Sequence, residues 1–110
     1  MSIAKNDAGL SIYPCSGKMV VSESTITAAT SPVVVNVVGG LGGGIYRGNR
    51  GYIANDGAFS LLVEIALEGT NYMSQFTLTQ GSNFDLTGMN ISNIRLTRSG
   101  GDTAYRVLVW

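Results

Sequence analysis

Apolar and polar residues alternate most regularly along residues 58–68, and this stretch predicts the central strand of the fold. Every second position carries a large apolar side chain: Phe59, Leu61, Val63, Ile65 and Leu67. A β-strand directs successive side chains to opposite faces, so these five are expected to share one buried face. The opposite face then carries the carboxylates of Glu64 and Glu68. Turn-forming residues precede and follow the stretch, which bounds the strand at both ends.

Shorter segments with strand-like patterns fill most of the remaining chain. They are residues 10–13, 18–21, 33–38, 45–47, 52–54, 72–79, 84–86, 90–98 and 103–110, whereas residues 22–30 fit either a strand or a helical turn. Turn residues recur about every eight to twelve positions, and no stretch has a clear helical period. We therefore predict an all-β fold, an antiparallel β-sandwich or jelly-roll-like barrel of about eight or nine short strands, with little or no helix.

The turn chemistry also predicts which strands pair. Residues 48–51 are expected to close a hairpin between 45–47 and 52–54, and residues 99–102 to close the last hairpin. On that last hairpin Arg95 and Arg106 would be cross-strand neighbours, and their like charges would need an acidic partner, expected on another chain.

Two further strands are expected to be covered on both faces. The β-branched run 33–38 is typical of a strand in the middle of a sandwich or at a subunit contact. The last strand, residues 103–110, carries large apolar side chains on both faces. It is therefore expected to be central in a sheet or to be covered by a neighbouring subunit.

Length and charge limit the possible functions. At 110 residues the chain fits one domain, which we predict as an N-terminal arm, residues 1–9, and a single β domain, residues 10–110. Charged residues make up 13%, against about 25% in a usual globular protein. Seven basic and seven acidic residues cancel, which favours neither nucleic acid nor an acidic membrane as a partner. So weakly charged a surface is expected to face another protein.

No motif supports catalysis, so we predict a protein that is not an enzyme and has no cofactor or metal. The chain has no histidine and a single cysteine, Cys15, which removes the commonest general base and metal ligands. The glycine-rich run 39–44 is followed by Ile45 rather than by the Lys and Ser or Thr of a phosphate-binding loop. Glu64 and Glu68 would lie about 13 Å apart along a strand, beyond the roughly 5–9.5 Å of a glycosidase pair.

The Gly/Ser/Thr/Asn-rich, histidine-free β pattern, ending on the strand Val107-Leu108-Val109-Trp110, resembles small virion accessory proteins of tailed bacteriophages. The likeness is strongest over residues 84–110. These families comprise capsid decoration (cement) proteins and small tail or baseplate proteins. The resemblance implies a β-sandwich or jelly roll that forms a homo-oligomer, often a trimer, and binds a viral coat or tail protein. It also implies a final location in the virion. Residues 1–7 lack the apolar core of a signal peptide, so we expect synthesis in the host cytoplasm without such a signal.

The leading hypothesis is thus a structural capsid decoration protein; a phage tail or baseplate protein is the alternative in the same class. Nine residues are candidates for protein contact: Leu41, Ile45, Tyr46, Arg47, Arg50, Tyr52, Arg106, Leu108 and Trp110. They combine apolar anchors with the arginine and aromatic residues enriched at interfaces. A second alternative is a carbohydrate- or surface-binding β module, which would stack sugars on Tyr46, Tyr52, Tyr72 or Trp110.

Overall fold

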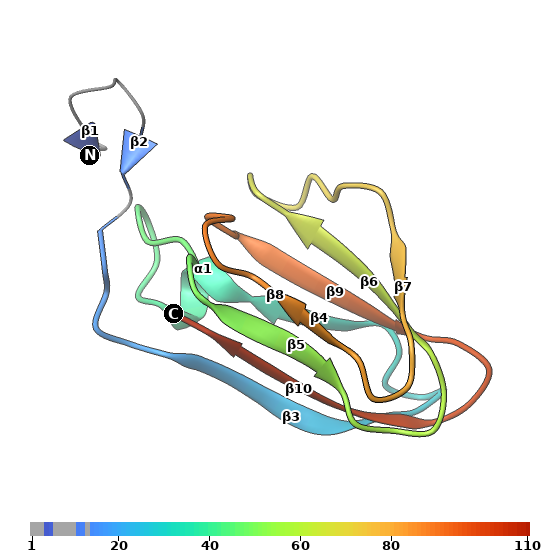
Figure 1. The fold of residues 1–110 in the computed structure, drawn as a ribbon. Coiled ribbons are helices and arrows are strands. Elements are labelled where there is room, and N and C mark those ends of the chain that lie inside the picture. The colour runs from blue at the N-terminus through green and yellow to red at the C-terminus, as the bar shows by residue number, and fades with distance from the viewer. Residues whose placement is uncertain (1–3, 6–10, 13) are drawn as a thin grey trace.

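The computed structural model describes residues 4–5, 11–12 and 14–110, and these residues are almost entirely β (Figure 1). The strands are β1 (Ala4–Lys5), β2 (Ser11–Ile12), β3 (Val20–Ile26), β4 (Val33–Asn36), β5 (Gly51–Asn55), β6 (Leu61–Ala66), β7 (Phe76–Leu78), β8 (Asn83–Asp85), β9 (Asn93–Arg98) and β10 (Thr103–Val109). One short helix, α1 (Val37–Gly40), follows β4. The predicted all-β class is confirmed.

Eight of the strands form two antiparallel four-stranded sheets that face each other (Figure 1). The two-stranded pair of β1 and β2 is sheet A. Of the two larger sheets, sheet B has the order β3-β10-β5-β8 and sheet C the order β4-β9-β6-β7. The pairing is nested, since β3 pairs with β10, β4 with β9, β5 with β8 and β6 with β7. Nested antiparallel pairing wound over two sheets is the topology of a jelly roll, one of the two architectures that the sequence predicts.

Alternating residues on the inner faces of the two sheets form one hydrophobic core. The inward-facing set includes Val35, Ile53, Leu61, Val63, Ile65, Ile94, Leu96, Val107 and Val109, each no more than 5% exposed. β10 alternates fully, with Thr103, Tyr105, Val107 and Val109 buried and the residues between them partly exposed. The large apolar groups predicted on both faces of this strand therefore divide between the core and the outer surface of sheet B.

The central strand is shorter than its sequence pattern. β6 covers Leu61–Ala66, and the inward side chains of Leu61, Val63 and Ile65 are buried as expected. Phe59 and Leu67 are 46% and 40% exposed, because they lie in the turns that flank the strand. The prediction of five apolar side chains on one buried face is thus wrong at its two ends.

Both predicted hairpins are also wrong. The loop of residues 99–102 joins β9 in sheet C to β10 in sheet B, so it crosses between the sheets. Residues 45–47 form no strand, and β5 pairs instead with β10 and β8. Arg95 and Arg106 consequently lie in different sheets and are not cross-strand neighbours. Local turn chemistry did not indicate these pairings because each strand finds its partner far along the chain.

The run 33–38 is divided between two elements. β4 ends at Asn36, whose side chain accepts a hydrogen bond from the Gly39 backbone N–H at 2.9 Å and so caps α1. Val34 is 55% exposed on the outer face of sheet C, so the chain itself covers only one face of this strand, and the alternative of a subunit contact stays a prediction. The predicted N-terminal arm, residues 1–9, lies mostly outside the described residues; its described part, β1, pairs with β2, which follows the arm.

Candidate functional site

Apolar side chains gather on the outer face of sheet B, near the end of β10. Val21, Leu108 and Tyr52 lie side by side across β3, β10 and β5, and therefore share one face. Trp110 follows two residues after Leu108 on that face. Val20 pairs with Val109, so continuing the register by one residue places Met19 beside Trp110. We call this group the Trp110 face: Met19, Val21, Tyr52, Leu108 and Trp110.

The Trp110 face is exposed although its members are apolar. Val21 is 59% exposed, Met19 50% and Trp110 38%. The backbone of Trp110 is held by two hydrogen bonds with Arg50, one in each direction, at 2.9 and 3.0 Å. A contiguous exposed apolar patch on a small protein commonly marks a site of protein–protein contact.

The edge of sheet B next to this face is open. β3 is the outermost strand, seven residues long, and within the described part of the chain it pairs only with β10. No lysine or proline lies within β3 to protect that edge from pairing with another strand. An apolar face and an unpaired edge thus adjoin at the same strand.

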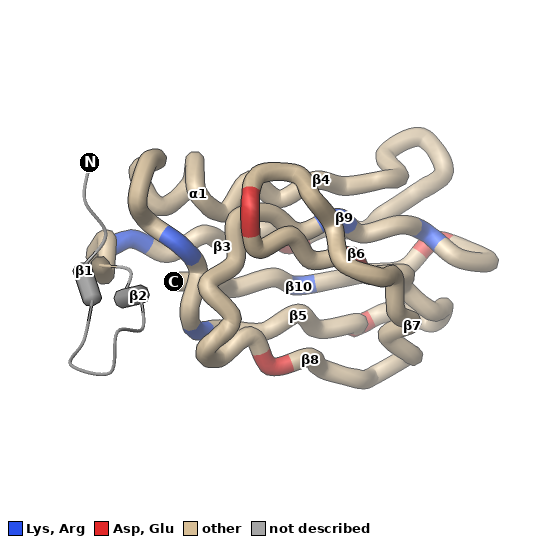
Figure 2. Tube along the Cα trace, turned by 90° about the horizontal axis from the view of Figure 1, so that it is seen from above, with Lys and Arg blue, Asp and Glu red and all other residues tan. Residues whose placement is uncertain are grey.

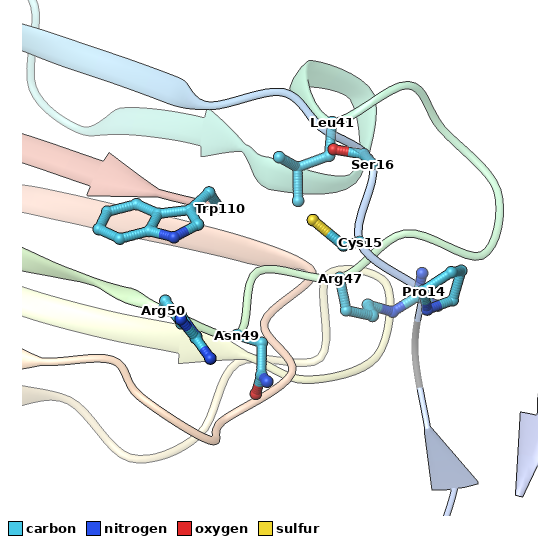
Figure 3. A pocket seen from close by; sticks show the side chains of 8 residues that line it. All are labelled: Pro14, Cys15, Ser16, Leu41, Arg47, Asn49, Arg50 and Trp110. Carbon is cyan, nitrogen blue, oxygen red and sulfur yellow. The ribbon is translucent and has the colours of Figure 1, made fainter.

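A pocket of about 350 Å³ lies at the same end of the sandwich (Figure 3). Its lining comes from the segment before β3, from the end of α1, from the loop before β5 and from the end of the chain: Pro14, Cys15, Ser16, Leu41, Arg47, Asn49, Arg50 and Trp110. Figure 3 shows Trp110 on one side of the space, Arg47 and Pro14 on the other, and Arg50 below Trp110. The lining combines two guanidinium groups with apolar surface.

The two arginines of the pocket differ in how firmly they are held. The Arg47 side chain is 13% exposed, and its Nη1 donates to the carbonyl oxygens of Gly44 at 2.8 Å and Tyr46 at 3.0 Å. Its Nη2 lies 3.9 Å from Oε1 of Glu68. Arg50 is exposed and makes no ion pair with any described carboxylate.

Elsewhere the arginines are neutralised within the chain. Arg95 binds Glu64 through two hydrogen bonds, at 3.0 and 2.7 Å, across β9 and β6. Arg106 binds Asp56 in the same way, at 2.6 and 3.2 Å. These hydrogen bonds hold the pKa of each carboxyl below its usual value. The acidic partner of Arg106, expected on another chain, is therefore Asp56 of this chain.

The structure brings several of the nine predicted contact residues to this one end of the molecule. Tyr52, Leu108 and Trp110 lie on the Trp110 face, and Arg47 and Arg50 line the pocket. Leu41 also lines the pocket but is only 1% exposed, so it belongs mainly to the core.

The other three predicted contact residues lie around these two features. Tyr46 is partly buried against the core, and Ile45 precedes it in the loop. Arg106, besides its bond to Asp56, donates to the Tyr52 hydroxyl at 3.2 Å. It therefore borders the Trp110 face.

Sequence reasoning missed Met19 and Val21 on the face, and Pro14, Cys15, Ser16 and Asn49 in the pocket. The run 19–21 is apolar at every position, so its pattern does not show which side chain faces inward. The pocket residues come from segments that only the tertiary fold brings together. No local signal in the sequence indicates them.

The four aromatic residues considered as sugar-stacking platforms are not gathered together. Tyr52 and Trp110 belong to sheet B, whereas Tyr72 forms a bridge with Ala66 of sheet C. The guanidinium of Arg95 lies 4.2 Å from the centre of the Tyr72 ring and covers it. Tyr46 is packed against the core.

No protein-family model, curated protein or solved structure matches the chain. Over the described residues, none of the helices reaches the length and apolar character needed to cross a membrane. The same part of the chain contains no group of three Cys, Asp or Glu residues placed to hold a metal ion.

Proposed function

We propose that this protein is a non-enzymatic structural component that binds copies of itself and a larger protein assembly through the Trp110 face. The observation that carries the proposal is the exposure of Val21, which lies beside Leu108 on the outer face of sheet B, together with the exposure of Met19 and Trp110 at the adjoining ends of β3 and β10. Water does not solvate such a surface favourably, and its burial against a protein contributes about 25 cal/mol per Å² of apolar area. The tryptophan supplies the kind of anchor that dominates binding energy at interfaces.

The jelly-roll topology and the phage-like sequence pattern favour a virion as the larger assembly. Eight-stranded jelly rolls are common in viral capsid domains, although the fold also serves other functions. We therefore propose a bacteriophage capsid decoration protein that acts as a homo-oligomer on a lattice of coat protein. A position in the tail or baseplate is the second candidate, supported by the same surface.

Co-sedimentation with shells of the coat protein encoded in the same genome tests this proposal. We expect saturable binding, and we expect Trp110→Ala to raise the Kd at least tenfold, since a buried interface tryptophan contributes about 2 kcal/mol or more. The thermal unfolding midpoint should change little, because Trp110 is partly exposed in the free protein.

Phe59→Ala is the matched control for this experiment. It removes another exposed aromatic side chain, 46% exposed, which packs beside Gly101 in the loop between β9 and β10. We expect its Kd for the shell to stay within about twofold of wild type. Absence of binding by the wild type, or equal loss in both variants, would contradict the proposal.

A further inference from the structure

We propose that the pocket beside Trp110 binds an acidic peptide segment of the partner protein, with its carboxylate at Arg50 and a neighbouring aliphatic side chain against the Trp110 indole. This inference rests on the proposed function, because it names the part of the partner that the surface would hold. It goes further by assigning a ligand chemistry to a site that no sequence motif indicates.

The charge of the pocket favours an anionic group. Arg47 and Arg50 line it, and none of the side chains that line it is acidic. Lys18 follows the lining residue Ser16 by two positions, and its Nζ is 3.9 Å from the position of a Cβ built on Gly42, which follows the lining residue Leu41. Neither Arg50 nor Lys18 has an ion-pair partner among the described carboxylates. Figure 2 shows basic positions gathered at the end of the sandwich marked by the C-terminus.

The remaining lining favours an apolar group next to that anion. Pro14 and Trp110 supply carbon surface on different sides of the space (Figure 3). Its volume of about 350 Å³ is near the lower end of the roughly 300–1,000 Å³ of small-molecule pockets. The space therefore suits one or two amino-acid side chains rather than a large cofactor.

The site is partly formed before binding. The backbone of Trp110 is held by its hydrogen bonds to the backbone of Arg50, and the Arg47 side chain by its bonds to two carbonyl oxygens. A preformed site loses less conformational entropy when its ligand binds. An extended segment fits better than a free small acid, because the lining residues 14–16 lead into β3, whose open edge can pair with an added strand.

A fluorescence titration tests the inference, because Trp110 is the only tryptophan of the chain and lies in the site. The probes are acetylated, amidated hexapeptides of glycine and serine in which leucine, isoleucine or valine precedes one glutamate. We expect at least one of them to shift the Trp110 emission saturably. Replacing its glutamate by glutamine should raise the Kd at least fivefold.

A double-mutant cycle locates the carboxylate. Arg50→Gln should weaken the glutamate peptide at least fivefold but leave the glutamine peptide within twofold, because the charge contact is then already absent. Arg98→Gln is the matched control, since Arg98 is also partly exposed but pairs with Asp102 in the loop after β9. It should leave both Kd values within twofold.

Three results would overturn the inference: no saturable shift with any peptide, equal affinity of glutamate and glutamine peptides, or at least tenfold tighter binding of the phosphoserine counterpart. The last would identify a phosphate site instead. If the peptides fail while the wild-type protein still binds the coat shell, the ligand assignment alone is wrong. If the peptides bind to the protein but the coat shell does not, the ligand assignment of the pocket is supported and the proposed function is contradicted.

Discussion

Most charged side chains of this molecule are neutralised by an ion pair with another side chain of the same chain. The pair of Arg95 and Glu64 is the most enclosed, with side chains 36% and 16% exposed, and it joins two adjacent strands of sheet C. Tyr72 adds a ring contact to the same arginine. The pattern of the sequence predicted the outward position of Glu64. It did not predict the partner, because Arg95 is thirty-one positions away and the assumed hairpin paired its strand with the last strand instead of β6.

This pair should make stability depend on pH in the acid range. The hydrogen bond from Arg95 lowers the pKa of Glu64 in the folded protein. The stabilisation is therefore fully present above the unfolded pKa of about 4.3, and is lost as the pH falls through the lower folded pKa. We expect Glu64→Gln to unfold at a lower temperature than wild type at pH 7, with the difference shrinking below about pH 4.

Thermal unfolding followed by circular dichroism between pH 2 and pH 8 measures this difference. Glu68→Gln is the control, because the Glu68 side chain is 77% exposed and its contact with Arg47 is long. The unfolding temperature of Glu68→Gln should depend on pH in the same way as that of wild type. A Glu64→Gln curve parallel to wild type over the whole range would show that the pair does not contribute to the pH dependence.

At the scale of elements, the sequence predicted strands better than it predicted their pairing. The alternation of apolar and polar residues identified β6, β9 and β10, because the residues within each strand show by themselves which side chains face the core. The nested order of the jelly roll is not local, and the turn of residues 99–102 has the composition of a hairpin loop while joining two sheets. The end of β4 was also missed, since the cap by Asn36 competes with the strand preference of the valines.

The close packing of β5 against β10 requires glycine at position 51, and a substitution there tests this requirement. Gly51 begins β5 with φ +126°, and a Cβ there would overlap the carbonyl oxygen of Leu108 in β10. We expect Gly51→Ala to lower the free energy of unfolding by about 2–5 kcal/mol, from backbone strain and overpacking together. Urea denaturation measures the change.

Gly69 provides the comparison for this substitution. It also has positive φ, +54°, but a Cβ there would meet no atom within 4 Å. Gly69→Ala should therefore cost only about 1 kcal/mol, the strain of the left-handed conformation alone. Equal losses in the two variants would show that the close approach of β5 to β10 is not what requires glycine.

At the scale of the whole molecule, closing the sandwich buries one face of each sheet and leaves the outer face of sheet B partly apolar. Val21 and Leu108 are adjacent there, next to Trp110 and to the open edge of β3. The low charge of the sequence predicts a contact surface, which stays a proposal, and the apolar residues of the last strand indicated part of the exposed apolar face that the structure shows. The contribution of β3 required the register, because only pairing with β10 shows that Val21 faces outward.

The most direct test of this account is light scattering during size-exclusion chromatography, over a range of concentrations, of wild type, Val21→Lys and Val34→Lys. Val21 and Val34 are 59% and 55% exposed, and each lies on the outermost strand of its sheet, but only Val21 belongs to the Trp110 face. We expect wild type and Val34→Lys to form the same oligomer, and Val21→Lys to elute as a monomer with an unchanged far-ultraviolet circular dichroism spectrum. A wild-type protein that stays monomeric at every concentration, or a Val21→Lys variant that associates like wild type, would contradict the assignment of this face.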